Sequence, residues 1–185
     1  MTSEVLTKSL TSSHPVFPSR LGSKIVGREF SQYPHMSAFG ALLRTSRLNY
    51  FHRGSLLPMY GIRATKNDDI SFLLSTSQKR QESLAAALAT SLSEQPAWSL
   101  ESWLPFTGKI DWANVSWKLR ICPCCTRYGY HTLLFQLPWV ERCPIHGEHL
   151  LDHCRRCERP LLRDMPHESP LLHCLCGHDA VGMCQ

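Results

Sequence analysis

The stretch of sequence that decides the fold is a series of four paired units: Cys122-Pro-Cys-Cys125, Cys143-Pro-Ile-His146, Cys154-Arg-Arg-Cys157 and Cys174-Leu-Cys176. Zinc prefers four sulfur and nitrogen ligands in a tetrahedron, and a short gap lets one tight turn present two of them to one ion. The units pair in chain order, because 17 residues separate Cys125 from Cys143 and 16 separate Cys157 from Cys174. The sequence therefore predicts two structural zinc ions. The first site is Cys122, Cys125, Cys143 and His146, and the second is Cys154, Cys157, Cys174 and Cys176.

Some positions of these sites have alternative ligands. Cys124 stands beside Cys125 and can replace it. The Cys-x-Cys unit of the second site is tighter than usual, so Cys184 or His173 can replace one of its members. The other histidines of this segment are interpreted as structural or surface residues. They are His131, His149, His153 and His178.

The cysteines also indicate a compartment. All nine fall between Cys122 and Cys184, and an odd number in Cys-x-x-Cys units favours metal ligation over disulfides where no export signal precedes them. The first twenty residues lack the apolar stretch of a secretory signal, and no run of about 18 apolar residues follows. We therefore expect a cytoplasmic protein without a membrane association.

Length and composition set the domain organisation. The chain has 185 residues, of which 43% are apolar and 19% charged, which excludes collagen, coiled coils and wholesale disorder. We predict an α+β protein with a loosely docked or disordered tail over residues 1–19. A basic helical region follows over residues 20–118, in outline like a helix-turn-helix protein. Residues 119–185 are predicted to form two small zinc-ribbon modules with short strands.

Four helices are predicted in the N-terminal part. One begins behind Ser37, a residue type that caps helices, and continues through apolar positions to Tyr50. A second begins at Asn67-Asp68-Asp69, and two more are expected over residues 81–92 and 100–104.

The cysteine-rich part contains residues that favour β-structure. Residues 128–137 predict a strand or a hairpin. Pro123 and Pro144 follow the first cysteine of their units and predict tight turns. A segment of about 65 residues with so many turns buries little apolar surface, so we expect metal to hold it together.

The net positive charge is confined to the N-terminal part. Residues 1–118 carry 13 Lys and Arg against 8 Asp and Glu, whereas residues 119–185 carry 7 of each. Residues 20–66 hold eight basic residues and one acid, Glu29, which favours contact with a polyanion. Seven thiolates contribute −7 and two Zn²⁺ ions +4, so metal binding makes the cysteine-rich part more negative. The candidate nucleic-acid-binding residues are Arg28, Arg44, Arg47, Arg53, Arg63 and Lys66.

Catalytic signatures are missing from the sequence. A zinc ion with four protein ligands has no open position for water or substrate. The sequence contains no Gly-rich phosphate loop, His-Glu-x-x-His helix or Gly-x-Ser-x-Gly elbow. We therefore expect no enzyme activity. The alternative is a thiol enzyme that uses Cys124 or Cys184.

The order of motifs resembles the TniQ family. The motifs are Arg120-Ile-Cys-Pro-Cys-Cys125, Tyr130 to Val140 with Gln136-Leu-Pro138, Cys143-Pro-Ile-His-Gly147, Leu150-Leu151, Cys154-x-x-Cys157 and Cys174-x-Cys176-Gly177. The match covers residues 120–177, and the earlier residues share only a helical character with the family.

The resemblance implies an adaptor that is not catalytic. Such a protein selects target sites for DNA transposition, and it links a DNA site or an RNA-guided CRISPR effector complex to an AAA+ ATPase and the transposase. It implies the same two zinc sites, and self-association is compatible with it. Many family members continue with a helical region that reads target DNA, whereas this chain ends at Gln185, which favours a bridging role. The alternative is an autonomous zinc-containing DNA-binding regulator.

Overall fold

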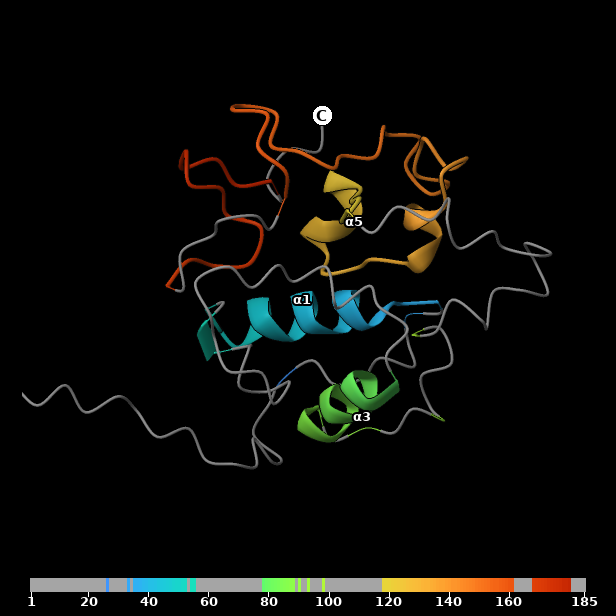
Figure 1. The fold of residues 1–185 in the computed structure, drawn as a ribbon, viewed down its shortest axis with the longest axis vertical. Coiled ribbons are helices and arrows are strands. Elements are labelled where there is room, and N and C mark those ends of the chain that lie inside the picture. The colour runs from blue at the N-terminus through green and yellow to red at the C-terminus, as the bar shows by residue number, and fades with distance from the viewer. Residues whose placement is uncertain are drawn as a thin grey trace, which may run out of the picture.

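The computed structural model describes residues 26, 33, 35–52, 54–55, 78–88, 90, 93, 98, 118–161 and 168–180. Their elements follow in the order α1 (Ala38–Leu48), α3 (Gln78–Ala87), α5 (Pro123–Arg127) and the 3-10 helix η7 (Leu133–Gln136). β-Structure in this part of the chain is limited to five isolated bridges, so the expected short strands are not present there. α1 lies between α3 and the cysteine-rich half (Figure 1).

Several predicted features lie outside the described residues. They are the tail over residues 1–19, the helix from Asn67-Asp68-Asp69 and the helix over residues 100–104. Most residues between α1 and α3 are also outside. The helix-turn-helix arrangement and the domain boundaries therefore stay predictions.

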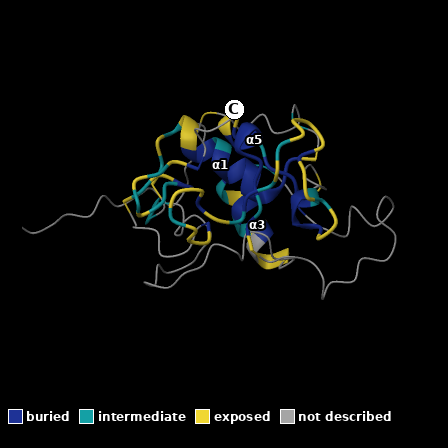
Figure 2. Cartoon of the chain, turned by 90° about the horizontal axis from the view of Figure 1, so that it is seen from above, coloured by how far each residue is buried: buried dark blue, intermediate teal, exposed yellow. Residues whose placement is uncertain are grey.

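α1 begins where the sequence predicts it. The Ser37 side chain caps the helix and accepts a hydrogen bond from the Gly40 N–H at 3.1 Å, which satisfies one of the free N–H groups of the first turn. Eight of the 11 residues of α1 are buried, and Phe39, Leu42 and Leu43 join the main core (Figure 2). A helix buried on most sides acts as a central support and leaves little surface for a DNA groove.

α3 lies against α1 on the side away from the cysteine-rich half (Figure 1). The helix predicted over residues 81–92 is present, although it spans Gln78–Ala87. Leu84 is buried in the same core cluster as α1, and the Gln81 Nε2 donates a hydrogen bond to the Trp98 carbonyl at 2.9 Å. The cluster also takes in apolar residues of the cysteine-rich half, so one core joins the two parts.

Two glycines allow α1 to approach the cysteine-rich half closely. A Cβ atom at Gly40 would lie 2.8 Å from the His131 carbonyl oxygen. A Cβ atom at Gly129 would lie 2.9 Å from the Arg44 Cα, and Gly129 also has a φ of 69°. Gly40 faces the His131 backbone, and Gly129 faces the Cα and Cβ of Arg44, whose positions the backbone of α1 fixes, so neither neighbour can turn away. The contact therefore depends on residues that the hydrophobic pattern of the sequence does not reveal.

His131 ties the start of α1 to the cysteine-rich half. It is completely buried, with its Nδ1 2.6 Å from the Ser37 Oγ and its Nε2 3.1 Å from the Arg120 carbonyl oxygen. A neutral imidazole satisfies both contacts when the Ser37 hydroxyl donates to Nδ1 and the Nε2–H donates to the carbonyl. The ring also meets Phe39 and Phe135 edge-on, with centroids 5.1 and 5.5 Å away.

The strand or hairpin predicted over residues 128–137 is wrong, because this segment continues from the end of α5 into η7. The Thr132 side chain accepts a hydrogen bond from the Leu134 N–H at 3.4 Å and so starts the 3-10 turn. A strand sends successive side chains to opposite faces, whereas three of the four η7 residues are buried. Contacts on both sides of the segment therefore override its β-propensity.

The burial of His131 predicts a pH-dependent stability. Burial lowers the pKa of His131 to about 3, below its ordinary value of 6.5. Between these values the unfolded chain binds one proton more than the folded chain, so stability falls as the pH falls from 6.5 towards 3. The slope from this one group is about 1.4 kcal/mol per pH unit. Urea unfolding of the wild type and of His131→Asn as a function of pH measures it.

The non-titrating variant is expected to be less stable at pH 7 but to lose stability more slowly on acidification. The difference between the two slopes removes the contribution of other groups, the cysteine ligands included. Parallel slopes would show that His131 does not titrate as its burial requires.

Candidate metal centres

Three of the four paired units share one backbone conformation. Each unit is flanked by an isolated β-bridge: Arg142 to His149, His153 to Pro160 and His173 to Asp179. In each, the N–H of the first cysteine bonds to a carbonyl four or five residues later at 2.8 Å. We call these turns the knuckles, over residues 142–149, 153–160 and 173–179. Each knuckle closes through one left-handed residue: Gly147 with φ 69°, Glu158 with φ 57° and Gly177 with φ 79°.

The first unit is the beginning of a helix and not the tight turn that its proline predicts. Cys122 is the N-cap of α5, and Pro123 stands in the first turn, where its fixed φ and missing N–H are tolerated. Cys125 lies three residues after Cys122 and so faces the same side. Ile121 and Leu151 exchange two backbone hydrogen bonds at 2.8 Å, which attaches α5 to the segment between the first two knuckles.

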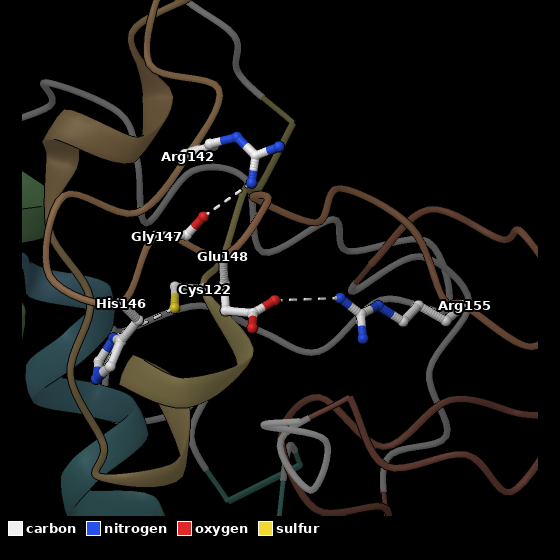
Figure 3. Close-up of polar contacts among 6 residues, drawn as sticks. All are labelled: Cys122, Arg142, His146, Gly147, Glu148 and Arg155. Atoms are coloured by element: carbon white, nitrogen blue, oxygen red, sulfur yellow. Dashed lines mark hydrogen bonds and ion pairs between the residues drawn. The ribbon is translucent and has the colours of Figure 1, made fainter.

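The first quartet consists of Cys122, Cys125, Cys143 and His146, whose ligand atoms all lie within 4.8 Å of one another. The His146 Nδ1 is 3.3 Å from the Cys125 Sγ and 3.6 Å from the other two sulfurs. Figure 3 shows His146 beside Cys122. The sulfurs of Cys125 and Cys143 are 3.6 Å apart. Cys124 is buried beside this quartet, but it is disulfide-bonded and is not among the four residues that converge.

The second quartet consists of Cys154, Cys157, Cys174 and Cys176, within the same 4.8 Å limit. The Cys154 and Cys176 sulfurs are 3.6 Å apart, and those of Cys157 and Cys174 are 3.4 Å apart. Only Cys154 is buried here, whereas all three cysteines of the first quartet are. His173, an alternative ligand by sequence, does not converge with this quartet. The other alternative, Cys184, lies outside the described residues.

The distances between the ligand atoms of each quartet fit an ion with tetrahedral coordination. Zn–S bonds of about 2.3 Å and Zn–N bonds of about 2.0 Å at tetrahedral angles require S···S distances of about 3.8 Å and S···N distances of about 3.5 Å. The observed 3.3–3.6 Å separations are close to these values. All seven cysteines of the quartets are free thiols. Two groups of four residues are therefore placed to hold two metal ions.

Without a cation, the first quartet does not hold three thiolates. A hydrogen bond from the Cys125 thiol lowers the pKa of Cys122 to about 5. The same hydrogen bond to Cys122, together with burial, raises the pKa of Cys125 far above its ordinary value. Burial likewise raises the pKa of Cys143. A metal ion would displace the thiol protons and stabilise all three sulfurs as thiolates. Its binding is therefore coupled to proton release and to folding.

In the second quartet, burial raises the pKa of Cys174 to about 12, with the neighbouring thiols adding to the effect. Arg156 contacts the cysteines of the same quartet. The Arg156 N–H donates to the Cys154 Sγ at 3.4 Å, and its Nη1 donates to the Cys176 carbonyl at 3.3 Å. A cation close to four thiolates offsets part of their negative charge, so Arg156 supports the site from outside the ligand set.

One polar contact lies within the first knuckle and another joins the first two knuckles. The Arg142 Nη1 donates to the Gly147 carbonyl at 3.0 Å and braces the first knuckle (Figure 3). The Nη2 of Arg155 in the second knuckle lies 4.0 Å from the Oε2 of Glu148 in the first knuckle, and the two side chains form an ion pair (Figure 3). A partly exposed pair at this distance contributes little stability, about 0–1 kcal/mol. The pair therefore helps to orient the two knuckles relative to each other, but it adds little to their stability.

The predicted nucleic-acid-binding arginines have internal partners where they are described. The Arg44 guanidinium lies over the Tyr33 ring at 4.4 Å. The Arg47 Nη1 donates to the carbonyls of Thr126 and Arg127 at 2.8 and 2.9 Å and caps the end of α5. The other four candidates lie outside the described residues. They are Arg28, Arg53, Arg63 and Lys66.

Sequence reasoning missed two features of the metal centres. The helical setting of the first unit has a signal in Pro123, which is a frequent first residue of helices. The left-handed position of Glu158 has a signal in the alignment of the three knuckles, where glycine stands at the other two equivalent positions. Comparison of the units reveals only the second feature, because Pro144 holds the same place as Pro123 in a unit that forms a knuckle.

Among the described residues, no helix has both the length and the apolar character that a membrane span requires. Comparison with known proteins gives no relative, because no protein-family model and no curated protein matches the chain.

Removal of one ligand should empty one quartet. Cys143→Ser is expected to lower bound zinc from about two ions to about one per chain and to unfold the first knuckle, because structural zinc binding is coupled to folding. Cys124→Ser is the matched control, and it should keep both ions. Elemental analysis of the purified variants measures the metal content. Full zinc content in Cys143→Ser would refute the assignment of this ligand.

The left-handed residues of the knuckles give a second prediction. Glu158→Gly removes the penalty of a side chain at positive φ and should stabilise the protein by about 1 kcal/mol. Gly147→Ala introduces the same penalty where no atom lies within 4 Å of the added Cβ, so it should destabilise by a similar amount. Thermal unfolding of the metal-loaded proteins tests both. Equal melting temperatures for the two variants would contradict the shared conformation.

Proposed function

We propose that this protein is a non-catalytic adaptor that is held together by two structural zinc ions and acts in target-site selection for DNA transposition. The observation that carries the proposal is the convergence of eight side chains into two closed quartets. They belong to motifs whose order and spacing resemble those of the TniQ family.

The donor sets support zinc as the metal and a structural role for it. One quartet offers three sulfurs and a nitrogen, the other offers four sulfurs, and both are typical of structural zinc sites. Four protein ligands leave no position for a reacting water. The knuckles are the kind of turn that zinc-ribbon modules use, so we interpret residues 119–185 as two such modules.

The proposed partners follow from the adaptor role. The protein would bind an AAA+ ATPase of the transposition machinery and a target-recognising element, either target DNA or a CRISPR guide-RNA complex. Self-association is compatible with this role. The cytoplasm is the proposed compartment, with which the seven free thiols of the quartets are compatible. The basic region would supply the nucleic-acid contact, mainly through the candidates for which no internal partner is described, Arg28, Arg53, Arg63 and Lys66.

A tagged pull-down from the native host, without a chelator, tests this function. The expected result is recovery of an AAA+ ATPase, with or without a CRISPR effector complex. Cys143→Ser is the matched control, and it should lose the partner together with one zinc ion. Recovery of DNA alone would contradict the adaptor role and favour an autonomous DNA-binding regulator.

A further inference from the structure

Exposed tyrosines lie where the ends of α1 and α5 meet. The Arg47 hydrogen bonds to the end of α5 bring the two helix ends together. Around this junction Tyr50 is 88% exposed and Tyr128 is 67% exposed. We call Arg47, Tyr50, Arg127 and Tyr128 the tyrosine surface. Tyr128 follows Arg127 directly and Tyr50 lies three residues after Arg47, so the Arg47 bond to the Arg127 carbonyl connects the two segments that carry the tyrosines.

The backbone of Tyr50 is strained. Its φ is 55°, and the Phe51 N–H bonds back to the Ser46 carbonyl at 2.9 Å, as in the turn that commonly ends helices with glycine. A bulky side chain in this conformation costs stability, and an exposed ring recovers little of it by packing. A strained aromatic residue held out into solvent is better explained by a binding role than by folding.

The two sequence segments that carry the tyrosine surface are basic. Residues 35–52 and 118–140 contain no Asp or Glu but contain five Arg and Lys residues. Two of these five, Arg47 and Arg127, are exposed beside the tyrosines. Such a surface is complementary to an anion that also carries flat rings. An acidic protein segment would match the charge but would leave the π-faces of both tyrosines without a specific partner.

We propose that the tyrosine surface binds single-stranded nucleic acid. Bases stack on Tyr50 and Tyr128, and phosphates lie against Arg47 and Arg127, which is how aromatic and basic side chains together bind single strands. The inference rests on the nucleic-acid contact of the proposed function but not on transposition. It assigns that contact to residues outside the predicted set, with the exception of Arg47.

Fluorescence anisotropy with labelled oligo-dT and oligo-rU of about 12 nucleotides tests the proposal on the full zinc-loaded chain. Tyr50→Gly is the decisive variant because it should raise the melting temperature while it weakens binding about tenfold. Tyr128→Ala should also weaken binding about tenfold. Tyr50→Phe keeps the ring and should bind like the wild type. Trp139→Ala removes another exposed aromatic residue, at the turn after η7, and should change nothing.

Comparison of the two oligonucleotides shows whether DNA or RNA is preferred, and weaker binding in both tyrosine variants supports the proposal in either case. An affinity that neither variant changes would overturn it, as would equal competition by poly-glutamate, which has the charge but no bases. Absence of binding by the wild type would overturn it as well. Zinc content and recovery of an ATPase are measured separately, so a failure here leaves the adaptor proposal standing.

Discussion

The convergence of four ligand side chains in each quartet is the constraint on which the cysteine-rich half depends. In its described residues, backbone pairing is limited to isolated bridges, and no sheet holds the turns in register. The quartets replace a sheet, because each joins units that are distant in the sequence. The first joins α5 to a knuckle, and the second joins two knuckles. Metal ions at these points would supply the stability that so small a segment does not obtain from apolar burial.

The two halves of the chain are linked through α1. Its buried face packs on α3, and its other side meets the backbone around His131 across Gly40 and Gly129. The Arg47 bonds to α5 add a polar contact at the far end of the helix. α1 thus holds the first quartet against the main core. The same arrangement places Arg44 over the Tyr33 ring and joins Arg47 to the end of α5, while Tyr50 stays exposed.

The sequence predicted the ligand units and the position of α1 better than it predicted the conformation between them. Spacing identifies the quartets because a metal site needs few residue types in fixed order. Ser37 marks the start of α1 because capping is a local interaction. β-Propensity is also local and predicts a strand or a hairpin over residues 128–137, whereas burial on several sides decides their structure. The close approaches at Gly40 and Gly129 depend on distant backbone, and no local pattern reveals them.

X-ray absorption at the zinc edge of the purified protein tests the central claim most directly. The account predicts two zinc ions per chain that share seven sulfurs and one nitrogen, all at tetrahedral distances. Chelation of the metal should then abolish the folded signal of the cysteine-rich half. One zinc ion per chain, a spectrum dominated by oxygen ligands, or a cysteine-rich half that stays folded without metal would contradict the account.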